Sequence, residues 1–523
     1  MPARRRSALA AGLLAALAAG LPAGSTAAPV TCGDYYSVED IAVPPGVAPD
    51  CNGLSFLPDG RLVAVFDHGE VCIYEPASRR WTRFAEGLHT PLGVLALSDR
   101  EILVCQRGEL TRLVDTTGAG VADLYECVTD QWGLSGNYHE FAYGPVRDAQ
   151  GNLYVALGAA SAGGVPRYEV RGTFKPRIPE FGARAMYSVV PYRGWVVRVG
   201  QGGDLVPIGG GFRQPNGIVL DPQGRLFVTD NQGDWIGTSK LHQVTPGGFY
   251  GHPSALVWRP DWKGPPSLLQ LETMRHEGVI LFSHAILANS PGQPVYDLTQ
   301  GKFGPFAGQM FVTEFNIPRL LRVMLEEVGG ELQGAVTPFY NGPPMRAGNI
   351  RLAFAPDGSL WVGQSDRRLG WPAGHGLQRV SWNGRTPMEV LAMHLTPTGF
   401  EFTFTKPLDA ASALRPEAYP ARRYYYLYQS AYGSPRIDIH GVRASHVALS
   451  QDGRRVSFDV DTLAPGYIYE FSLDGIKAAD GTQLLNPLIG YTVNRLRDGS
   501  SRPIPRPAPS GETAGSGKDE PTQ

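Results

Sequence analysis

The feature that most constrains the fold is a turn-and-strand unit that recurs along most of the chain. Each copy has a short apolar stretch, a turn rich in Pro, Asp or Gly, and a second apolar strand that ends near an acidic or amide residue. Alternating apolar strands on both sides of such a turn predict an antiparallel hairpin. The six copies are LSFLPDGRLVAVFDHGEV (54–71), VLALSDREILVCQRGEL (94–110), FAYGPVRDAQGNLYVALG (141–158), GIVLDPQGRLFVTDNQGD (217–234), FGPFAGQMFVTEF (303–315) and LAFAPDGSLWVGQSD (352–366).

A further apolar strand follows several copies, as in VCIYE, GWVVRVG, LLRVML and GLQRVSW. Repeats of about 40 to 50 residues with four short antiparallel strands are typical of propeller blades. We therefore predict an all-β fold with a six-bladed β-propeller over residues 28–385. A pair of β-sandwiches would also place turns at short spacing, but copies in one phase favour the propeller. Residues 168–192 and 253–290 are left as long loops on its faces.

The repeat stops after Trp382, and the sequence pattern changes twice beyond it. Residues 386–496 alternate apolar and polar side chains in short stretches, which predicts a small immunoglobulin-like β-sandwich. Residues 497–523 are rich in Ser, Pro, Gly, Glu and Lys, which predicts a disordered tail. Neither segment contains a recognisable catalytic cluster.

The first residues predict export. Three arginines precede an apolar run, a proline and small residues, so residues 1–27 are predicted to be a signal peptide and the protein to be periplasmic or secreted. No later run predicts a membrane span. All five cysteines lie between Cys32 and Cys127, and of the pairings open to them we favour a Cys32–Cys51 disulfide. Lys+Arg 47 against Asp+Glu 49 gives no basic field, so we expect no nucleic-acid partner.

The candidate site comes from the phase of the repeat. In a propeller the innermost strands surround a central channel, so the residues that precede them from different blades gather at one end. Histidine, arginine and amide side chains in such a ring suit proton abstraction from a hydroxyl and stabilisation of the resulting charge. His252 follows an aromatic turn and is assigned a structural role. The residues at these positions are Asn52, His89, His139 with Glu140, Arg213, Gln214, Asn216, Arg346, Asn349 and Arg351.

Three segments carry a family resemblance. Asn137-Tyr138-His139 is followed by GNLYVALG (151–158), FRQPNG (212–217) is followed by FVTD (227–230), and PGGFYGHP (246–253) closes the series. In order and spacing these segments resemble the soluble quinoprotein glucose/sorbosone dehydrogenases. The resemblance covers the propeller, about residues 54–382, and leaves the C-terminal sandwich outside it.

The resemblance implies a cofactor, a metal and residue roles. That family oxidises aldoses with pyrroloquinoline quinone (PQQ) and calcium, so it implies a sugar or polyol substrate and a periplasmic electron acceptor as partner. His139 would be the general base and Arg213 would hold the developing charge of the quinone. Gln214, Asn216, Arg346 and Arg351 would bind the cofactor, the two arginines replacing a family pair that falls on Gly348 and Ile350. The carbonyls of Gln232 and Gly233 would bind calcium.

Two other functions stay open at this point. Pro215-Asn216-Gly217 followed by the Phe227–Asp230 stretch also resembles gluconolactonase-like propellers, in which Asn216 would bind metal for a calcium-dependent lactonase. The chain would alternatively be a non-catalytic binding or scaffold propeller with its sandwich as a docking module, because fold alone does not decide function.

Overall fold

The chain is almost entirely β-structure in the computed structural model, which describes residues 30–161, 170–182, 184–366 and 374–506. The predicted signal peptide and residues 507–523 of the predicted tail lie outside these ranges. Within them, no helix has the length and apolar character needed to cross a membrane. The helices are all short: η1 (Cys32–Asp34), η2 (Pro179–Phe181), η3 (Pro253–Trp258), α1 (Leu268–Met274), α2 (Ala410–Ala413) and η4 (Pro416–Ala418).

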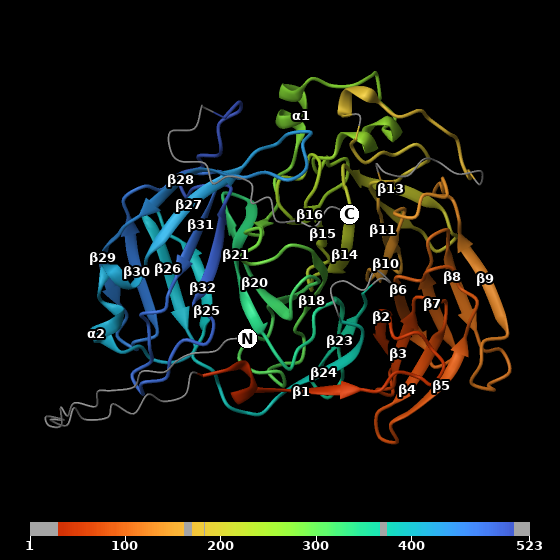
Figure 1. The fold of residues 1–523 in the computed structure, drawn as a ribbon, viewed down its shortest axis with the longest axis horizontal. Coiled ribbons are helices and arrows are strands. Elements are labelled where there is room, and N and C mark those ends of the chain that lie inside the picture. The colour runs from red at the N-terminus through yellow and green to blue at the C-terminus, as the bar shows by residue number, and fades with distance from the viewer. Residues whose placement is uncertain (1–29, 162–169, 183, 367–373, 507–523) are drawn as a thin grey trace, which may run out of the picture.

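Six antiparallel sheets form a closed ring in which the first strand of each sheet contacts the first strands of its two neighbours. This ring, β2, β6, β10, β14, β18 and β22, makes the propeller a six-bladed one, as predicted (Figure 1). The blades are β2 (Cys51–Phe56), β3 (Leu62–Phe66), β4 (Val71–Glu75), β5 (Arg80–Ala85); β6 (Gly93–Ser98), β7 (Glu101–Cys105), β8 (Leu110–Val114), β9 (Leu124–Thr129); β10 (Ala142–Arg147), β11 (Leu153–Leu157), β12 (Trp195–Val199), β13 (Leu205–Gly210); β14 (Pro215–Leu220), β15 (Leu226–Asp230), β16 (Lys240–Val244), β17 (Ile280–Leu281); β18 (Pro291–Tyr296), β19 (Met310–Glu314), β20 (Arg319–Val328), β21 (Glu331–Asn341); and β22 (Asn349–Phe354), β23 (Leu360–Gln364), β24 (Gly376–Trp382) with β1 (Tyr36–Ile41).

The sixth blade is completed by the start of the chain. β1 pairs antiparallel with β24, from Tyr36 opposite Trp382 to Ile41 opposite Leu377, so the two ends of the propeller sequence close the ring. The sequence analysis did not predict this strand. In the fifth copy of the repeat, residues 303–306 lie in the connection between β18 and β19, and the inner strand precedes them.

Glycine and aspartate explain the turns and the tight centre. Asp357 accepts a hydrogen bond from the Ser359 amide at 2.8 Å, and Gly358 between them has a φ of +93°, a value that favours glycine. At the centre, a Cβ added to Gly93 would lie 1.8 Å from the carbonyl oxygen of Gly144 in the next blade. The inner strands therefore approach too closely for a side chain at this point.

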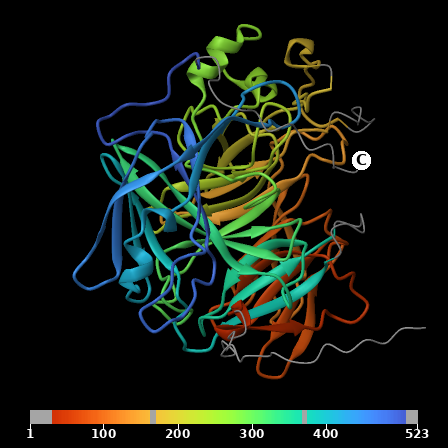
Figure 2. The same cartoon turned by 60° about the vertical axis from the view of Figure 1, so that its left-hand side comes forward.

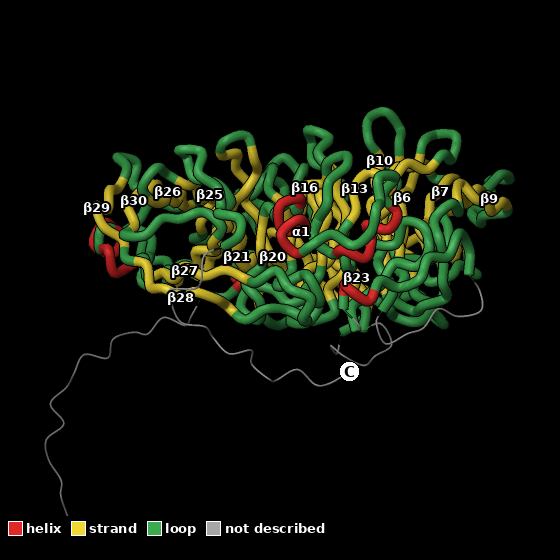
Figure 3. The backbone as a smooth tube through the Cα atoms, turned by 90° about the horizontal axis from the view of Figure 1, so that it is seen from above, coloured by secondary structure: helices red, strands yellow, loops and turns green. Residues whose placement is uncertain are grey.

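The C-terminal segment forms two sheets that pack around one core, and one of these sheets continues the fifth blade. β21 pairs with β32, so blade 5 and the strands β32, β31, β27 and β28 form one eight-stranded sheet. Figure 2 shows the blue C-terminal segment beside the green part of the propeller. Seen from above, the sandwich lies beside the propeller in the same thick layer (Figure 3). The immunoglobulin-like topology stays a prediction. The strands are β25 (Val390–Leu395), β26 (Gly399–Phe404), β30 (Arg455–Val460) and β29 (Ala444–Leu449) in one sheet, and β27 (Ala421–Tyr426), β28 (Arg436–Val442), β31 (Tyr467–Ser472) and β32 (Leu488–Val493) in the other.

Two sequence predictions are wrong in the described residues. All five cysteines are free thiols, and Cys32 and Cys51 belong to different hydrophobic clusters, so the Cys32–Cys51 disulfide is absent. Residues 497–506 of the predicted disordered tail are part of the fold, since Arg502 is only 9% exposed and forms an ion pair with Glu277 at 2.5 Å. A paired and buried arginine anchors a segment whose composition alone predicts disorder.

Candidate functional site

The residues that precede the inner strands are fixed by a side chain at the end of the neighbouring second strand. Asp230 ends β15 and accepts hydrogen bonds from the backbone amides of Arg213 at 3.0 Å and Gln214 at 2.7 Å. Glu314 ends β19 and accepts from the amides of Asn289 and Ser290 in the same way. Burial raises the pKa of Glu314 to about 7. In these two blades, the acidic residue that ends the second strand thus fixes the segment before the inner strand. This segment lies at the mouth, the end of the propeller that carries His89, Arg107, His139 and Arg213.

His139 lies at this mouth and is partly buried. Its Nδ1 lies 3.3 Å from the carbonyl oxygen of Ala159, and its ring centre lies 5.5 Å from that of Phe141. Arg193 is fully buried and fixes the loop that carries His139, because its guanidinium donates to the carbonyls of Glu140 and Phe141. Because a carbonyl only accepts, Nδ1 must carry the hydrogen, and Nε2 is then the basic nitrogen of the neutral ring.

Ala159 connects the two residues predicted to be catalytic. Its carbonyl contacts the His139 ring, and its amide donates to the Arg213 carbonyl at 3.0 Å. The loops of His139 and Arg213 therefore meet at the mouth, although they belong to different blades. Only the backbone of Arg213 lies close to His139 through Ala159, because the Arg213 side chain points towards Asp234.

The Arg213 guanidinium is committed to a buried carboxylate. Its Nε donates to Asp234 at 2.9 Å, and its Cζ lies 5.2 Å from the centre of the Tyr432 ring in the sandwich. Asp234 also contacts Nε2 of the fully buried His252 at 2.7 Å and accepts from the Met186 amide at 2.8 Å. Burial opposes ionisation, but His252 and Arg213 outweigh it and hold the pKa of Asp234 well below its usual range. The sequence analysis did not single out Asp234, the last residue of the fourth repeat copy, because its partners lie in separate segments of the sequence.

Arg351 and its neighbours fill the axis of the propeller. Arg351 is 2% exposed and donates to the carbonyls of Asn52, Leu92 and Asn216, each from a different blade. Asn216 is itself buried, and Gln214 donates to the Tyr143 hydroxyl at 2.6 Å. A cavity of about 30 Å³ remains beside them, which is room for a few water molecules at most. These predicted cofactor ligands lie together, but inside the protein core.

Arg346 is the fourth predicted cofactor ligand, and it is also engaged. Its Nη1 forms an ion pair with Asp40 at 2.9 Å, and its Nε donates to Gln364 at 3.0 Å. It therefore holds the loop before β22 against β1 within the sixth blade. A quinone with several carboxylates needs cations whose donors are not already used. Arg213 and Arg346 do not fit that requirement because each already binds a carboxylate, and Arg351 lies inside the core at 2% exposure.

The predicted calcium ligands do not fit a cation site. The Gly233 carbonyl accepts a hydrogen bond from the Gly433 amide at 3.0 Å. The Arg213 guanidinium lies against Gly233, where an added Cβ would be 1.8 Å from its Nε. Gln232 uses its side-chain amide on the Gly237 carbonyl. The described residues contain no group of three or more His, Cys, Asp or Glu side chains that could hold a metal, and calcium prefers six to eight oxygen ligands.

Arg107 is the cation at the mouth that sequence reasoning missed. It follows β7, and its guanidinium lies 5.2 Å from the centre of the Phe141 ring, the same ring that His139 contacts. Its Nε is buried and has no acceptor among the described residues, and no ion pair of Arg107 occurs there. Burial lowers the pKa of Arg107. Glu140 and Asp67 act on Arg107 without a direct ion pair among the described residues, and the buried Nε stays a donor for an anionic ligand.

Comparisons with known proteins find matches among solved structures. No family model matches the chain, and no curated protein matches it. The PQQ-bound aldose sugar dehydrogenase of Streptomyces coelicolor is 18% identical, with a TM-score of 0.44, over 66% of this chain and 98% of that one. The aldose sugar dehydrogenase of Escherichia coli is 15% identical, with a TM-score of 0.45, over 66% and 99%. The PQQ domain of Coprinopsis cinerea pyranose dehydrogenase is 12% identical, with a TM-score of 0.46, over 66% and 95%.

These solved structures include soluble PQQ aldose sugar dehydrogenases, the kind of protein that the sequence resembles. Identities this low and TM-scores below 0.5 leave the chemistry of this chain to its own residues.

Proposed function

We propose that the chain is an exported oxidoreductase that oxidises a sugar or a related alcohol at the mouth of the propeller. The observation that carries the proposal is the contact between His139 Nδ1 and the Ala159 carbonyl at 3.3 Å. This contact leaves Nε2 as the basic nitrogen, which is the form needed to accept a hydroxyl proton. Export rests on the signal-peptide pattern of the first 27 residues.

Each residue of the mouth has a separate role in the proposed oxidation. His139 accepts the proton of the substrate hydroxyl at Nε2, and the Ala159 carbonyl stabilises the imidazolium through the Nδ1 hydrogen. Arg193 keeps the loop in place from the core. Arg107 supplies positive charge for a carboxylate of a bound quinone, in place of the three predicted arginines. A quinone, when bound, supplies the acceptor for the hydride that leaves the carbinol carbon.

The test is dye reduction by the full chain after addition of PQQ, with and without calcium, across a panel of aldoses and polyols. His139→Gln should lower kcat about 100-fold or more while quinone binding, followed by absorbance, stays within a factor of three. Arg107→Gln should weaken quinone binding about tenfold. His446→Gln, an exposed histidine of the sandwich with 81% side-chain exposure, is the matched control and should change neither quantity.

Absence of quinone binding and turnover in the parent would contradict the proposal, as would His139→Gln at parental activity. Sugar binding without any turnover would favour the binding-propeller alternative. The lactonase alternative has less support, because Asn216 is 1% exposed and its carbonyl accepts from Arg351 at 3.0 Å. A metal ligand for an external substrate has to be reachable.

A further inference from the structure

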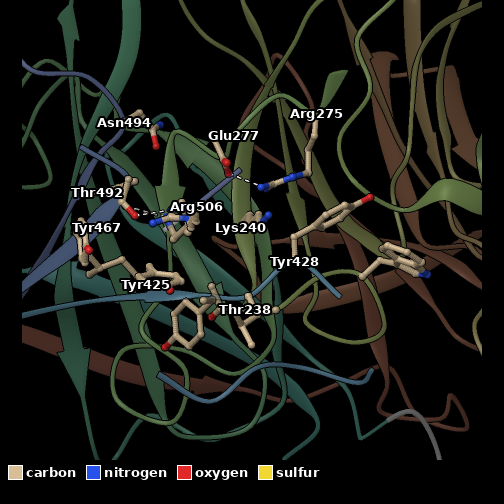
Figure 4. A pocket seen from close by; sticks show the side chains of 17 residues that line it. Thr238, Lys240, Arg275, Glu277, Tyr425, Tyr428, Tyr467, Thr492, Asn494 and Arg506 are labelled. Carbon is tan, nitrogen blue, oxygen red and sulfur yellow. Dashed lines mark hydrogen bonds and ion pairs between the residues drawn. The ribbon is translucent and has the colours of Figure 1, made fainter. Parts of the chain in front are cut away.

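A second polar cavity lies away from the mouth, between blade 4 and the sandwich. It is lined by Lys240 at the start of β16, Arg275 and Glu277 after α1, Tyr425 and Tyr428 around the end of β27, and Arg506 near the end of the described chain (Figure 4). Its volume is about 30 Å³. Such a space holds one small group and excludes a sugar ring.

Lys240 is the residue that most needs an explanation there. It is 4% exposed, and its ammonium forms no hydrogen bond or ion pair with any described residue. A buried charge without a partner is strongly unfavourable, and lysines are rarely buried this way. Burial and the nearby Arg275 lower the pKa of Lys240 to about 7.

Two arginines, Arg275 and Arg506, add further positive charge to the lining of the cavity. Arg275 forms an ion pair with Glu277 at 2.7 Å and lies 4.6 Å from the centre of the Tyr428 ring, but its Nε is buried without an acceptor. Arg506 lies 4.1 Å from the centre of the Tyr425 ring and donates to the Gly466 carbonyl. Glu277 is shared with a further arginine, Arg502, at 2.5 Å.

The lining therefore holds three cations, Lys240, Arg275 and Arg506, against one carboxylate, Glu277. With Lys240 in its ammonium form, the surplus of two positive charges matches a doubly charged oxyanion. Arg275 Nε is a buried donor without an acceptor among the described residues, and the Lys240 ammonium lines the same cavity. We propose that this cavity binds a phosphate group, either inorganic phosphate or the end of a phosphate monoester. The site is independent of the sugar oxidation proposed above, because its lining residues are not those of the mouth.

Several charged groups surround Lys240 and set how the site responds to pH. Phosphate binding requires the ammonium form of Lys240, so affinity should fall as the pH rises above neutrality. A bound phosphate would also favour the ammonium form of Lys240, so the loss of affinity would occur at higher pH. The titratable and charged groups that act on Lys240 are Arg275, Glu277, Asp230, Arg502 and His242.

The test is calorimetric titration of the full chain with sodium phosphate near pH 7, in a chloride background. The parent should bind close to one phosphate per chain. Lys240→Met should weaken binding at least tenfold, and Arg506→Gln should weaken it in the same direction. Lys263→Met changes an exposed lysine and is the matched control, with parental affinity expected. Glycerol phosphate in a second titration separates the two sources of the group, since only a site open to an ester binds it as tightly.

Thermal unfolding keeps the proposal falsifiable if a variant is poorly soluble. Phosphate should raise the melting temperature of the parent and of Lys263→Met, and it should leave that of Lys240→Met unchanged. No phosphate-dependent shift in the parent would overturn the proposal. Parental affinity in Lys240→Met would overturn it as well. Both readouts measure binding, so they stand or fall separately from dye reduction.

Discussion

At the scale of single residues, Asp234 joins three segments that are far apart in the chain. It accepts from Arg213, His252 and the Met186 amide within 2.9 Å. Asp234→Asn keeps the shape but leaves the Arg213 guanidinium without a counter-charge. We expect this variant to lose about 3 kcal/mol of unfolding free energy at neutral pH, measured by urea denaturation.

The same substitution should have a defined pH dependence. The pKa of Asp234 is held well below its unfolded value of 3.8, so its stabilisation is present above that pH and is lost as the pH falls further. The difference between parent and Asp234→Asn should therefore shrink in acid. Asp261→Asn, with a carboxylate 66% exposed, is the control and should stay near the parent. An equal loss of stability in Asp234→Asn and Asp261→Asn would contradict the stabilising role of the buried Asp234 carboxylate.

Lys240 gives the opposite case, a charge that destabilises the fold. Its pKa of about 7 lies below the unfolded value of 10.5, so the unfolded chain binds more protons between these values and stability rises with pH there. In phosphate-free buffer, Lys240→Met should raise the unfolding free energy by roughly 2–4 kcal/mol at pH 6. The gain should fade towards pH 10, and a gain that is constant with pH would contradict this account.

At the scale of elements, the inner strands pack on glycine. Gly93 in β6 faces the Gly144 carbonyl of the next blade, and an added methyl would lie 1.8 Å from that oxygen. Gly93→Ala should therefore cost about 3 kcal/mol, because the two strands must separate. Gly441→Ala meets nothing within 4 Å and serves as the control. Chemical denaturation of both variants checks this, and equal stabilities would show that the strands can move apart freely.

The sequence predicted the hairpins of the blades because their signal is local. Turn residues such as Asp357 and Gly358 act on their immediate neighbours, so the sequence alone contains all the residues that determine the turn. The role of the acidic residue after each strand was less visible. Asp230 bonds to Arg213, which precedes the neighbouring strand, and only the fold shows that the two meet.

At the scale of the whole molecule, Arg351 links blades across the axis. It donates to carbonyls of the first, second and fourth blades from its place in the sixth, at 2.7 to 3.1 Å. Arg351→Met removes these donors and leaves buried carbonyls unpaired, so we expect a loss of about 3 kcal/mol or more. Arg443→Met, at 87% side-chain exposure, is the control. A parental melting temperature in Arg351→Met would contradict this role.

Long-range closure is the part of the architecture that the sequence could not provide. β1 and β24 are separated by more than three hundred residues, and β21 and β32 are separated by more than one hundred residues of unrelated sequence. Such pairings depend on where whole blades end, not on local propensity. The same limit applies to the candidate site. His139 was found because it lies in the repeat, whereas Arg107 depends on a buried environment that sequence alone does not display.

The most direct measurement is a crystal structure of the full chain grown with saturating PQQ. If the mouth is where a quinone and an alcohol meet, new electron density will touch both His139 and Arg107, with Arg213 still bound to Asp234. Density only at another place, or an empty mouth at a quinone concentration that supports dye reduction, would contradict the proposed site.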